Sequence, residues 1–374
     1  MQSAHKMMRK GGGAVRFRIS QFYPIFLLLL LFLLADGAAE VSAVVAERIR
    51  FCLCTLIPSL FGCMAAANLL RESGAGRQLG FRLRNAAHLL RFPAECMGIF
   101  AVSQLAGYPV GAMLLKREAE AGNLSAGDAA HLSAVCCGGG PAFFVGFAGT
   151  ELFGSPAAGW VLFSACVLAN CAAAFLLRQN GKPVTAAEGP ACRLSPAALT
   201  GAVSDAVRSL TQICGIVMFF GVMTWLCGRL GLLRLMTAAG AYCGIREQTV
   251  SALFTALLDV TQLRGLLICG LPFSVLLPLT AGLLSFGGIC VQLQCLALGV
   301  PEMSAVRLLL TRLMTAVIAA LLTAAVLPFI SVPEAAAVFA HGTAVSRTGS
   351  AIPALLILCT GFPLLIYGNT SSTD

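Results

Sequence analysis

Apolar runs long enough to cross a lipid bilayer are the feature that most constrains this chain. The first reads ISQFYPIFLLLLLFLLA at residues 19–35, and similar runs follow it along the chain. A helix needs roughly 20 residues to cross a hydrocarbon layer about 30 Å thick. Charged residues make up only 11% of the 374 positions, whereas about 25% is usual in a soluble domain. The sequence therefore predicts an all-α protein, a polytopic bundle of transmembrane helices.

The further apolar runs set the number of membrane segments. The run at 141–177 is long enough for two passes, with a break at Gly154-Ser155-Pro156. The remaining runs cover residues 52–70, 94–115, 211–232, 250–270, 271–298, 304–330 and 351–368. We expect about 8–10 membrane segments in all.

The positive charge is distributed as the positive-inside rule describes for cytoplasmic loops. The formal net charge is +9, and Arg and Lys gather in short clusters at 6–18 and 71–91, separated by two predicted crossings. The first apolar run can also be read as a signal peptide, but its long basic flank and the runs after it favour an uncleaved span. We therefore expect a cell-membrane protein with a cytoplasmic N-terminus, the lipid bilayer as its partner and no nucleic-acid partner.

The chain is expected to contain two similar halves. A Phe-to-Gly interval at 100–111 recurs at 254–265, and a glycine cluster follows each. Ser195 and Pro196 predict a helix start, either of an interfacial amphipathic helix or of the polar beginning of the next span. The expected order is a basic tail, first transmembrane helix and connector at 1–50, a first repeat at 51–180, a linker at 181–195, a second repeat at 196–330, and a loop with the last transmembrane helix at 331–374.

Two of the apolar runs are interrupted by residues that do not favour a helix. The first contains Gly107-Tyr108-Pro109-Val110-Gly111, in which the proline lacks an N–H group and the glycines loosen the helix. The second contains Ser285-Phe286-Gly287-Gly288. Backbone groups freed at membrane depth are tolerated only in the protein interior or along a water-filled cavity. Paired interruptions in two halves of a chain indicate a transporter binding site, although the first can also be a proline kink that only shapes packing.

Two further segments supply polar groups. The glycines 138–140 predict a re-entrant tip or a tight turn, after a short helix that Ser125 and Asp128 cap. Asp259 is an acid inside an apolar run, which is costly and indicates a functional site. Arg264 is its expected partner; alternatively, Asp259 simply ends the span at the membrane interface.

These segments define the candidate site. Gln104 is included because a broken helix would expose its amide, and Thr261 and Gln262 because they neighbour the acid. By contrast, Arg307 and Arg312 are expected to extend their charged ends to the membrane interface. The predicted substrate-binding residues are Gln104, Gly107, Tyr108, Pro109, Gly111, Gly138, Gly139, Gly140, Asp259, Thr261, Gln262, Ser285, Gly287 and Gly288.

No catalytic or metal-binding motif stands out in the sequence. It contains no CxxC pair, no HExxH sequence, no nucleophile elbow and no phosphate-binding loop. Most of the 16 cysteines lie in apolar runs, where cysteine behaves as a small hydrophobic residue. We therefore expect no enzyme activity, no metal and no cofactor, and leave open a coupling proton or sodium ion and oligomer formation.

Short motifs between about residues 50 and 330 resemble the YlbJ-type sporulation integral membrane proteins, a family in the nucleoside-recognition (Gate) group. The motifs are Leu56-Ile57-Pro58-Ser59-Leu60-Phe61, Gly107-Tyr108-Pro109-Val110-Gly111-Ala112, Gly140-Pro141 with Phe144 and Gly146, Leu257-Leu258-Asp259-Val260-Thr261, and Ser285-Phe286-Gly287-Gly288. The chain departs from the family pattern at Cys137 and Gly138, where an Asn pair is expected, at Met113 instead of Lys, and at Asp259 instead of Glu.

The resemblance implies two Gate-like repeats with broken or re-entrant helices. It further implies a membrane permease that moves a small planar or nucleoside-like solute, with dipicolinic acid during spore formation as one candidate, in a membrane around the forespore. The alternative is a non-transporting integral membrane scaffold in sporulation or envelope assembly.

Overall fold

The computed structural model describes residues 24, 27–73, 75–90, 94–177 and 195–329, and every regular element among them is a helix. The all-α prediction is confirmed for these residues. The basic tail, the start of the first predicted span, most of the predicted linker and the last predicted span lie outside them.

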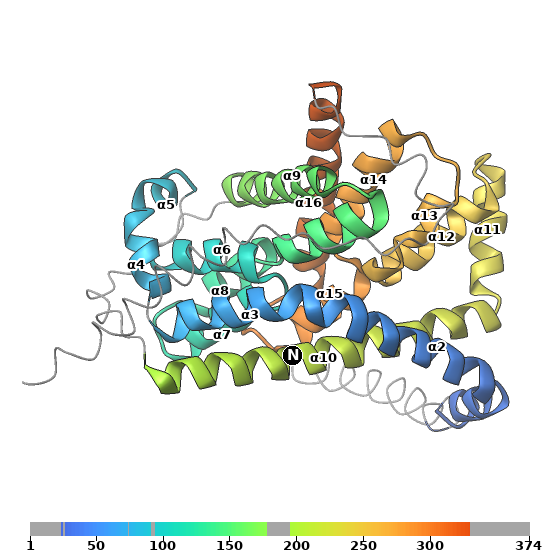
Figure 1. Cartoon of the computed structure of the whole chain (residues 1–374), viewed down its shortest axis with the longest axis horizontal. Helices are drawn as coiled ribbons and strands as arrows, with labels where there is room; N and C mark the ends of the chain where they lie inside the picture. Colours follow the sequence, from blue (N-terminus) through green and yellow to red (C-terminus); the bar gives the residue numbers. More distant parts are fainter. Residues whose placement is uncertain (1–23, 25–26, 74, 91–93, 178–194, 330–374) are drawn as a thin grey trace, which may run out of the picture.

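The helices follow one another closely along the chain (Figure 1). Those of the first half are Leu27–Asp36, α2 (Ala38–Phe51), a π-helix (Cys52–Leu56), α3 (Ile57–Glu72), α4 (Ala75–Arg82), α5 (Arg84–Leu90), α6 (Ala94–Ala106), α7 (Val110–Glu120), α8 (Ala126–Val135), a second π-helix (Phe143–Leu152) and α9 (Pro156–Leu176). Those of the second half are α10 (Pro196–Arg229), α11 (Leu232–Tyr242), α12 (Glu247–Leu258), a 3₁₀ turn (Val260–Gln262), α13 (Arg264–Leu267), α14 (Phe273–Phe286), α15 (Gly288–Ala297), α16 (Ala305–Val326) and a 3₁₀ turn (Leu327–Phe329).

Five helical stretches of the described residues are long and apolar enough to cross a membrane. They are Ala38–Leu70, Pro156–Leu176, Pro196–Arg229, Phe273–Ala297 and Ala305–Phe329. Three shorter apolar helices lie in other predicted runs, at Leu27–Asp36, Cys96–Ala106 and Phe143–Leu152. The count of long helices is below the predicted 8–10, in part because several predicted runs are divided into shorter helices.

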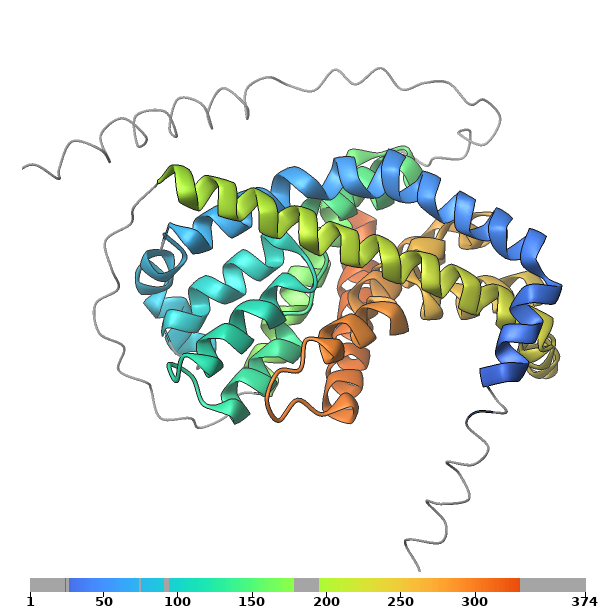
Figure 2. The same cartoon turned by 90° about the horizontal axis from the view of Figure 1, so that it is seen from below.

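Two of the long stretches lie side by side along the molecule. Figure 2 shows α10 next to the continuous blue helix formed by α2, the first π-helix and α3. At one end, Arg229 pairs with Asp36 at 2.7 Å, and the Trp225 indole donates to Glu40 at 2.7 Å. Ser195 caps α10 by accepting a hydrogen bond from the Ala198 amide at 3.1 Å. Residues after 196 are therefore the polar beginning of one long helix, and no separate interfacial helix forms.

Both sequence-predicted helix boundaries of the first half are confirmed. Ser125 accepts a hydrogen bond from the Asp128 amide at 3.1 Å and so caps α8. The run at 141–177 breaks at Gly154, whose φ of +63° suits glycine, and Ser155 then caps α9 through the Ala158 amide.

Close packing around α9 depends on two glycines. A Cβ atom on Gly159 would lie 2.6 Å from Val145 Cα and 2.7 Å from the Phe144 carbonyl oxygen. A Cβ atom on Gly149 would lie 2.7 Å from Gly159 Cα. The second π-helix and α9 therefore touch backbone to backbone, and this contact supports the bundle that α9 forms with α14 and α16.

Replacing Gly159 with alanine is expected to destabilise the protein by about 1–3 kcal/mol, because backbone atoms must move to admit the methyl group. Gly215→Ala is the matched control, since nothing lies within 4 Å of a Cβ at that position of α10. It should be neutral or stabilising by up to ~1 kcal/mol. Thermal unfolding of the detergent-solubilised variants measures both effects, and equal behaviour of the two variants would contradict this account of the packing.

Candidate functional site

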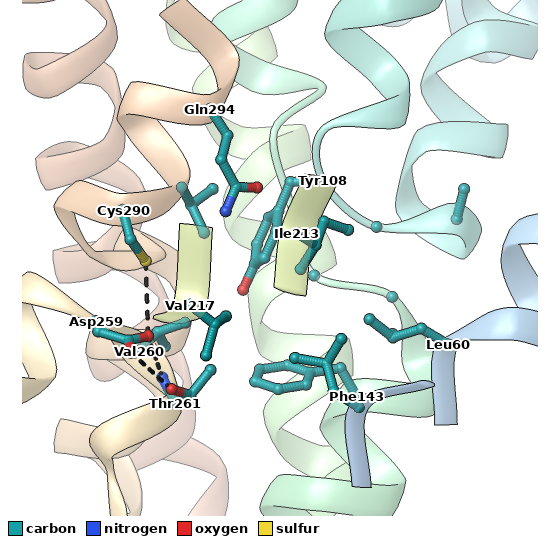
Figure 3. Close-up of a pocket in the computed structure, with 16 residues that line it drawn as sticks. Leu60, Tyr108, Phe143, Ile213, Val217, Asp259, Val260, Thr261, Cys290 and Gln294 are labelled. Carbon is teal, nitrogen blue, oxygen red and sulfur yellow. Dashed lines mark hydrogen bonds between the residues drawn. The ribbon is translucent and has the colours of Figure 1, made fainter. Parts of the chain in front are cut away.

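Residues from three helix interruptions line one small cavity between the two halves (Figure 3). Its wall is made by Leu56, Leu60, Ala106, Gly107, Tyr108, Gly139, Gly140, Phe143, Ile213, Val217, Asp259, Val260, Thr261, Cys290, Val291 and Gln294. The cavity has a volume of about 40 Å³. Since one water needs roughly 10–15 Å³ by this measure, it has room for a few waters or a solute of a few heavy atoms.

The two interruptions of the first half touch each other at this cavity. Gly107 ends α6 with a φ of +77°, and a Cβ there would lie 2.8 Å from the Gly140 amide nitrogen. The peptide bond between Tyr108 and Pro109 is cis, and α7 starts directly after it. The glycines 138–140 form an irregular, buried segment between α8 and the next helix, as the triple glycine predicts.

Asp259 is the charged group of the wall. It lies immediately after α12 in extended conformation and is 0% exposed. Its carboxylate accepts hydrogen bonds from the Thr261 amide at 3.0 Å and the Thr261 hydroxyl at 2.8 Å. The Cys290 thiol lies 3.7 Å from the same group. Asp259 also ends α12, and the alternative that it ends its span at the membrane interface stays a prediction.

The expected pairing of Asp259 with Arg264 is wrong. Arg264 instead pairs with Glu151 at 2.9 Å, and 62% of its side chain is exposed. The chain leaves the helix at Asp259 and makes a 3₁₀ turn before α13, so the arginine is carried to the outside. Asp259 takes part in none of the ion pairs found among the described residues.

The interruption between α14 and α15 packs at the edge of the cavity. Gly287 and Gly288 have φ values of +81° and +75°, which favour glycine. A Cβ on Gly287 would lie 3.7 Å from the Tyr108 ring, and one on Gly288 would lie 3.0 Å from the Val260 amide nitrogen. The broken segments of the two halves therefore meet at Tyr108, and the two interruptions of the second half meet at Val260.

Arg312 is the functional candidate that sequence reasoning missed. Instead of extending to an interface, it is 1% exposed, whereas Arg307 on the same helix is exposed. Its guanidinium donates to the Ala134 carbonyl at 3.2 Å, to Asn170 Oδ1 at 3.0 Å and to the Ser285 carbonyl. Ala134 and Ser285 belong to the last turns of α8 and α14. Each helix C-terminus carries roughly half a negative charge, so together they offset the charge of the guanidinium.

Two side-chain amides outside the cavity wall extend the hydrogen bonds of Arg312. Asn170 donates to Gln104 Oε1 at 2.8 Å, and Gln104 donates to the Ser103 hydroxyl at 3.2 Å. A Cβ on Gly138 would lie 2.8 Å from Asn170 Nδ2. Side-chain amides therefore lie beside Gly138. Asn170, like Arg312, is a polar residue inside an apolar run, and this signal was available in the sequence.

The predicted site residues thus separate into two groups. Gly107, Tyr108, Gly139, Gly140, Asp259 and Thr261 line the cavity. Gln104, Pro109, Gly111, Gly138, Gln262, Ser285, Gly287 and Gly288 lie outside its wall. Gly111 packs α7 against α8, because a Cβ there would lie 2.4 Å from the Cys136 carbonyl oxygen. The wall also includes Phe143, Cys290 and Gln294, which the sequence analysis did not single out.

Comparison of the chain with protein-family models, curated proteins and solved structures found no match. The cavity has a definite chemical character. It combines a buried carboxylate, a phenol hydroxyl and an amide with a mostly hydrocarbon wall. This combination suits non-covalent binding of a small molecule that has both a polar and an apolar part.

Proposed function

We propose that the chain is a membrane permease for a small solute and that the Asp259 cavity is its binding site. The observation that carries this proposal is the convergence of broken helices on a cavity that holds a buried carboxylate, which has no ion pair within the described part of the chain. Interrupted helices are tolerated at membrane depth where they surround a cavity, and they form the substrate sites of many transporters. An acid buried among membrane helices is costly, which supports a functional role.

The order of elements supports a two-repeat architecture for this permease. A helix with an interruption, a second helix with an interruption and a long helix follow one another as α6–α7, α8 with the second π-helix, and α9. The same order recurs as α12–α13, α14–α15 and α16. We propose that these are the two Gate-like repeats that the family resemblance implies, with the site between them.

The size of the cavity limits the size of the solute that can bind without a movement of the wall. Pockets for drug-sized ligands usually measure about 300–1,000 Å³, so a nucleoside or dipicolinate would need the wall to move apart before it could bind. The proposal therefore includes an opening movement for solutes of that size. A solute of a few heavy atoms fits the cavity as it stands.

Uptake into liposomes tests the proposal against the scaffold alternative. The purified protein is reconstituted, and uptake of labelled nucleosides, dipicolinate and small amines is compared with that of protein-free liposomes. We expect at least one solute to enter faster with the protein and to raise its unfolding temperature. If no solute enters the liposomes and none raises the unfolding temperature, the permease proposal fails and the scaffold alternative is favoured.

A further inference from the structure

Two polar side chains of the cavity wall, Tyr108 and Gln294, carry a buried atom without a hydrogen-bond partner among the described residues. Gln294 is 4% exposed, and its Oε1 atom has no hydrogen-bond partner among the described residues. The buried Tyr108 hydroxyl also has none. Figure 3 shows the Gln294 amide and the Tyr108 hydroxyl pointing toward the middle of the cavity, whose opposite side Asp259 occupies. Buried polar atoms are usually satisfied, so the unpartnered Gln294 Oε1 and Tyr108 hydroxyl indicate a ligand that can donate to them. The Asp259 carboxylate already accepts from Thr261, but a carboxylate has room for further donors.

The wall contains no positive charge to balance Asp259. None of the lining residues is Lys, Arg or His. Arg48 on α2 acts on Asp259 only through space, without an ion pair, and it is not part of the wall. The guanidinium of Arg312 donates to Ala134, Asn170 and Ser285, and Arg312 is not part of the wall.

An anionic solute is therefore poorly matched to this cavity. A carboxylate inside it would face the Asp259 carboxylate in a space of low dielectric constant, without a free cationic donor in the wall. Like charges repel strongly under these conditions. The same surroundings favour a cation, because desolvation strengthens its attraction to the buried acid.

We infer that the site binds a small primary alkylammonium ion, an inference that rests on the proposed function and narrows its substrate class. An ammonium group carries one positive charge and three N–H donors. Those donors match the Asp259 carboxylate, Gln294 Oε1 and the Tyr108 hydroxyl oxygen. The alkyl part fits the hydrocarbon side of the wall, which includes Leu60, Ile213, Val217 and Phe143. The cavity volume limits the ion to a few heavy atoms.

Three solutes of nearly equal size test the charge preference: propylammonium, propanamide and propionate. The unfolding temperature of the purified full-length protein is measured with each, at matched ionic strength in sodium chloride. We expect propylammonium to raise it by about 2–4 °C, and the other two to leave it unchanged. Asp259→Asn should weaken propylammonium binding at least tenfold, and Gln294→Leu should weaken it less. Leu257→Ala, an exposed position on α12 outside the wall, should leave binding unchanged.

Three results would overturn the inference. The first is stabilisation by propionate or dipicolinate but not by propylammonium. The second is a propylammonium effect that Asp259→Asn retains in full. The third is a rise in the unfolding temperature that sodium chloride alone causes, that depends on Asp259 and that propylammonium does not increase. This result would indicate a site for an inorganic cation. If an anion or a neutral solute is taken up in place of the amine, the ammonium inference fails and the permease proposal stands. If the amine binds but no solute is taken up, only the permease proposal fails.

Discussion

Arg312→Ala is expected to destabilise the protein by about 3 kcal/mol. The substitution leaves the Ala134 and Ser285 carbonyls and the Asn170 amide oxygen without their donor, and a buried unsatisfied acceptor costs about 1–3 kcal/mol. It also leaves a void where a fully buried long side chain was. Part of the loss is offset because an uncharged side chain does not have to be desolvated.

Arg307→Ala is the matched control for this effect. Arg307 lies on the same helix but is exposed, and surface substitutions usually change stability by less than about 0.5 kcal/mol. Denaturation of both variants in mixed micelles, followed by circular dichroism, gives the comparison. If the two variants unfold alike, Arg312 does not hold the ends of α8 and α14 as described.

Asp259→Asn is expected to lower solute uptake at least tenfold while the protein remains folded. Hydrogen bonds to a charged group are worth about 1.5–3 kcal/mol, and ~1.4 kcal/mol corresponds to a factor of ten in affinity. Asparagine keeps the size and an oxygen acceptor for the Thr261 amide, and it removes a charge that is costly to bury. Uptake into proteoliposomes and the unfolding temperature, measured on one preparation, separate function from stability.

The control for this variant is Glu151→Gln. Glu151 is the partly exposed acid that pairs with Arg264, and such pairs contribute only about 0–1 kcal/mol. We expect its uptake to remain close to that of the unchanged protein. Full uptake by the Asp259 variant would show that the buried carboxylate is not part of the binding site.

Local signals in the sequence predicted the helix interruptions well. The glycines and the proline at 107–111, and the pair Gly287 and Gly288, disfavour a regular helix through their own backbone preferences, and several of them in one short segment make a local signal. Asp259 was recognisable for the same reason, as a charge within an apolar run. These features need no knowledge of the three-dimensional packing.

The partners of charged residues could not be read from position along the chain. Arg312 lies near the start of an apolar run, where arginine commonly reaches the interface, but its direction depends on which face of α16 meets α8, α9 and α14. Arg264 follows Asp259 closely, yet the 3₁₀ turn between them directs it to Glu151. Gln294 is one of two glutamines on α15, and only the packing shows that its side chain faces the cavity.

The cavity wall has unequal sides, and this affects how it can open. On the side of the first π-helix, α3 and α10, the lining groups are the hydrocarbon side chains of Leu56, Leu60, Ile213 and Val217. Parting them costs about 25 cal/mol for each Å² of apolar surface exposed, and a solute or lipid chain can cover that surface. Parting the ends of α8 and α14 would instead strip hydrogen bonds from a buried guanidinium. In the proposed permease we therefore expect solute to enter through the apolar side, and smaller side chains there to speed the exchange of solute more than they alter its affinity.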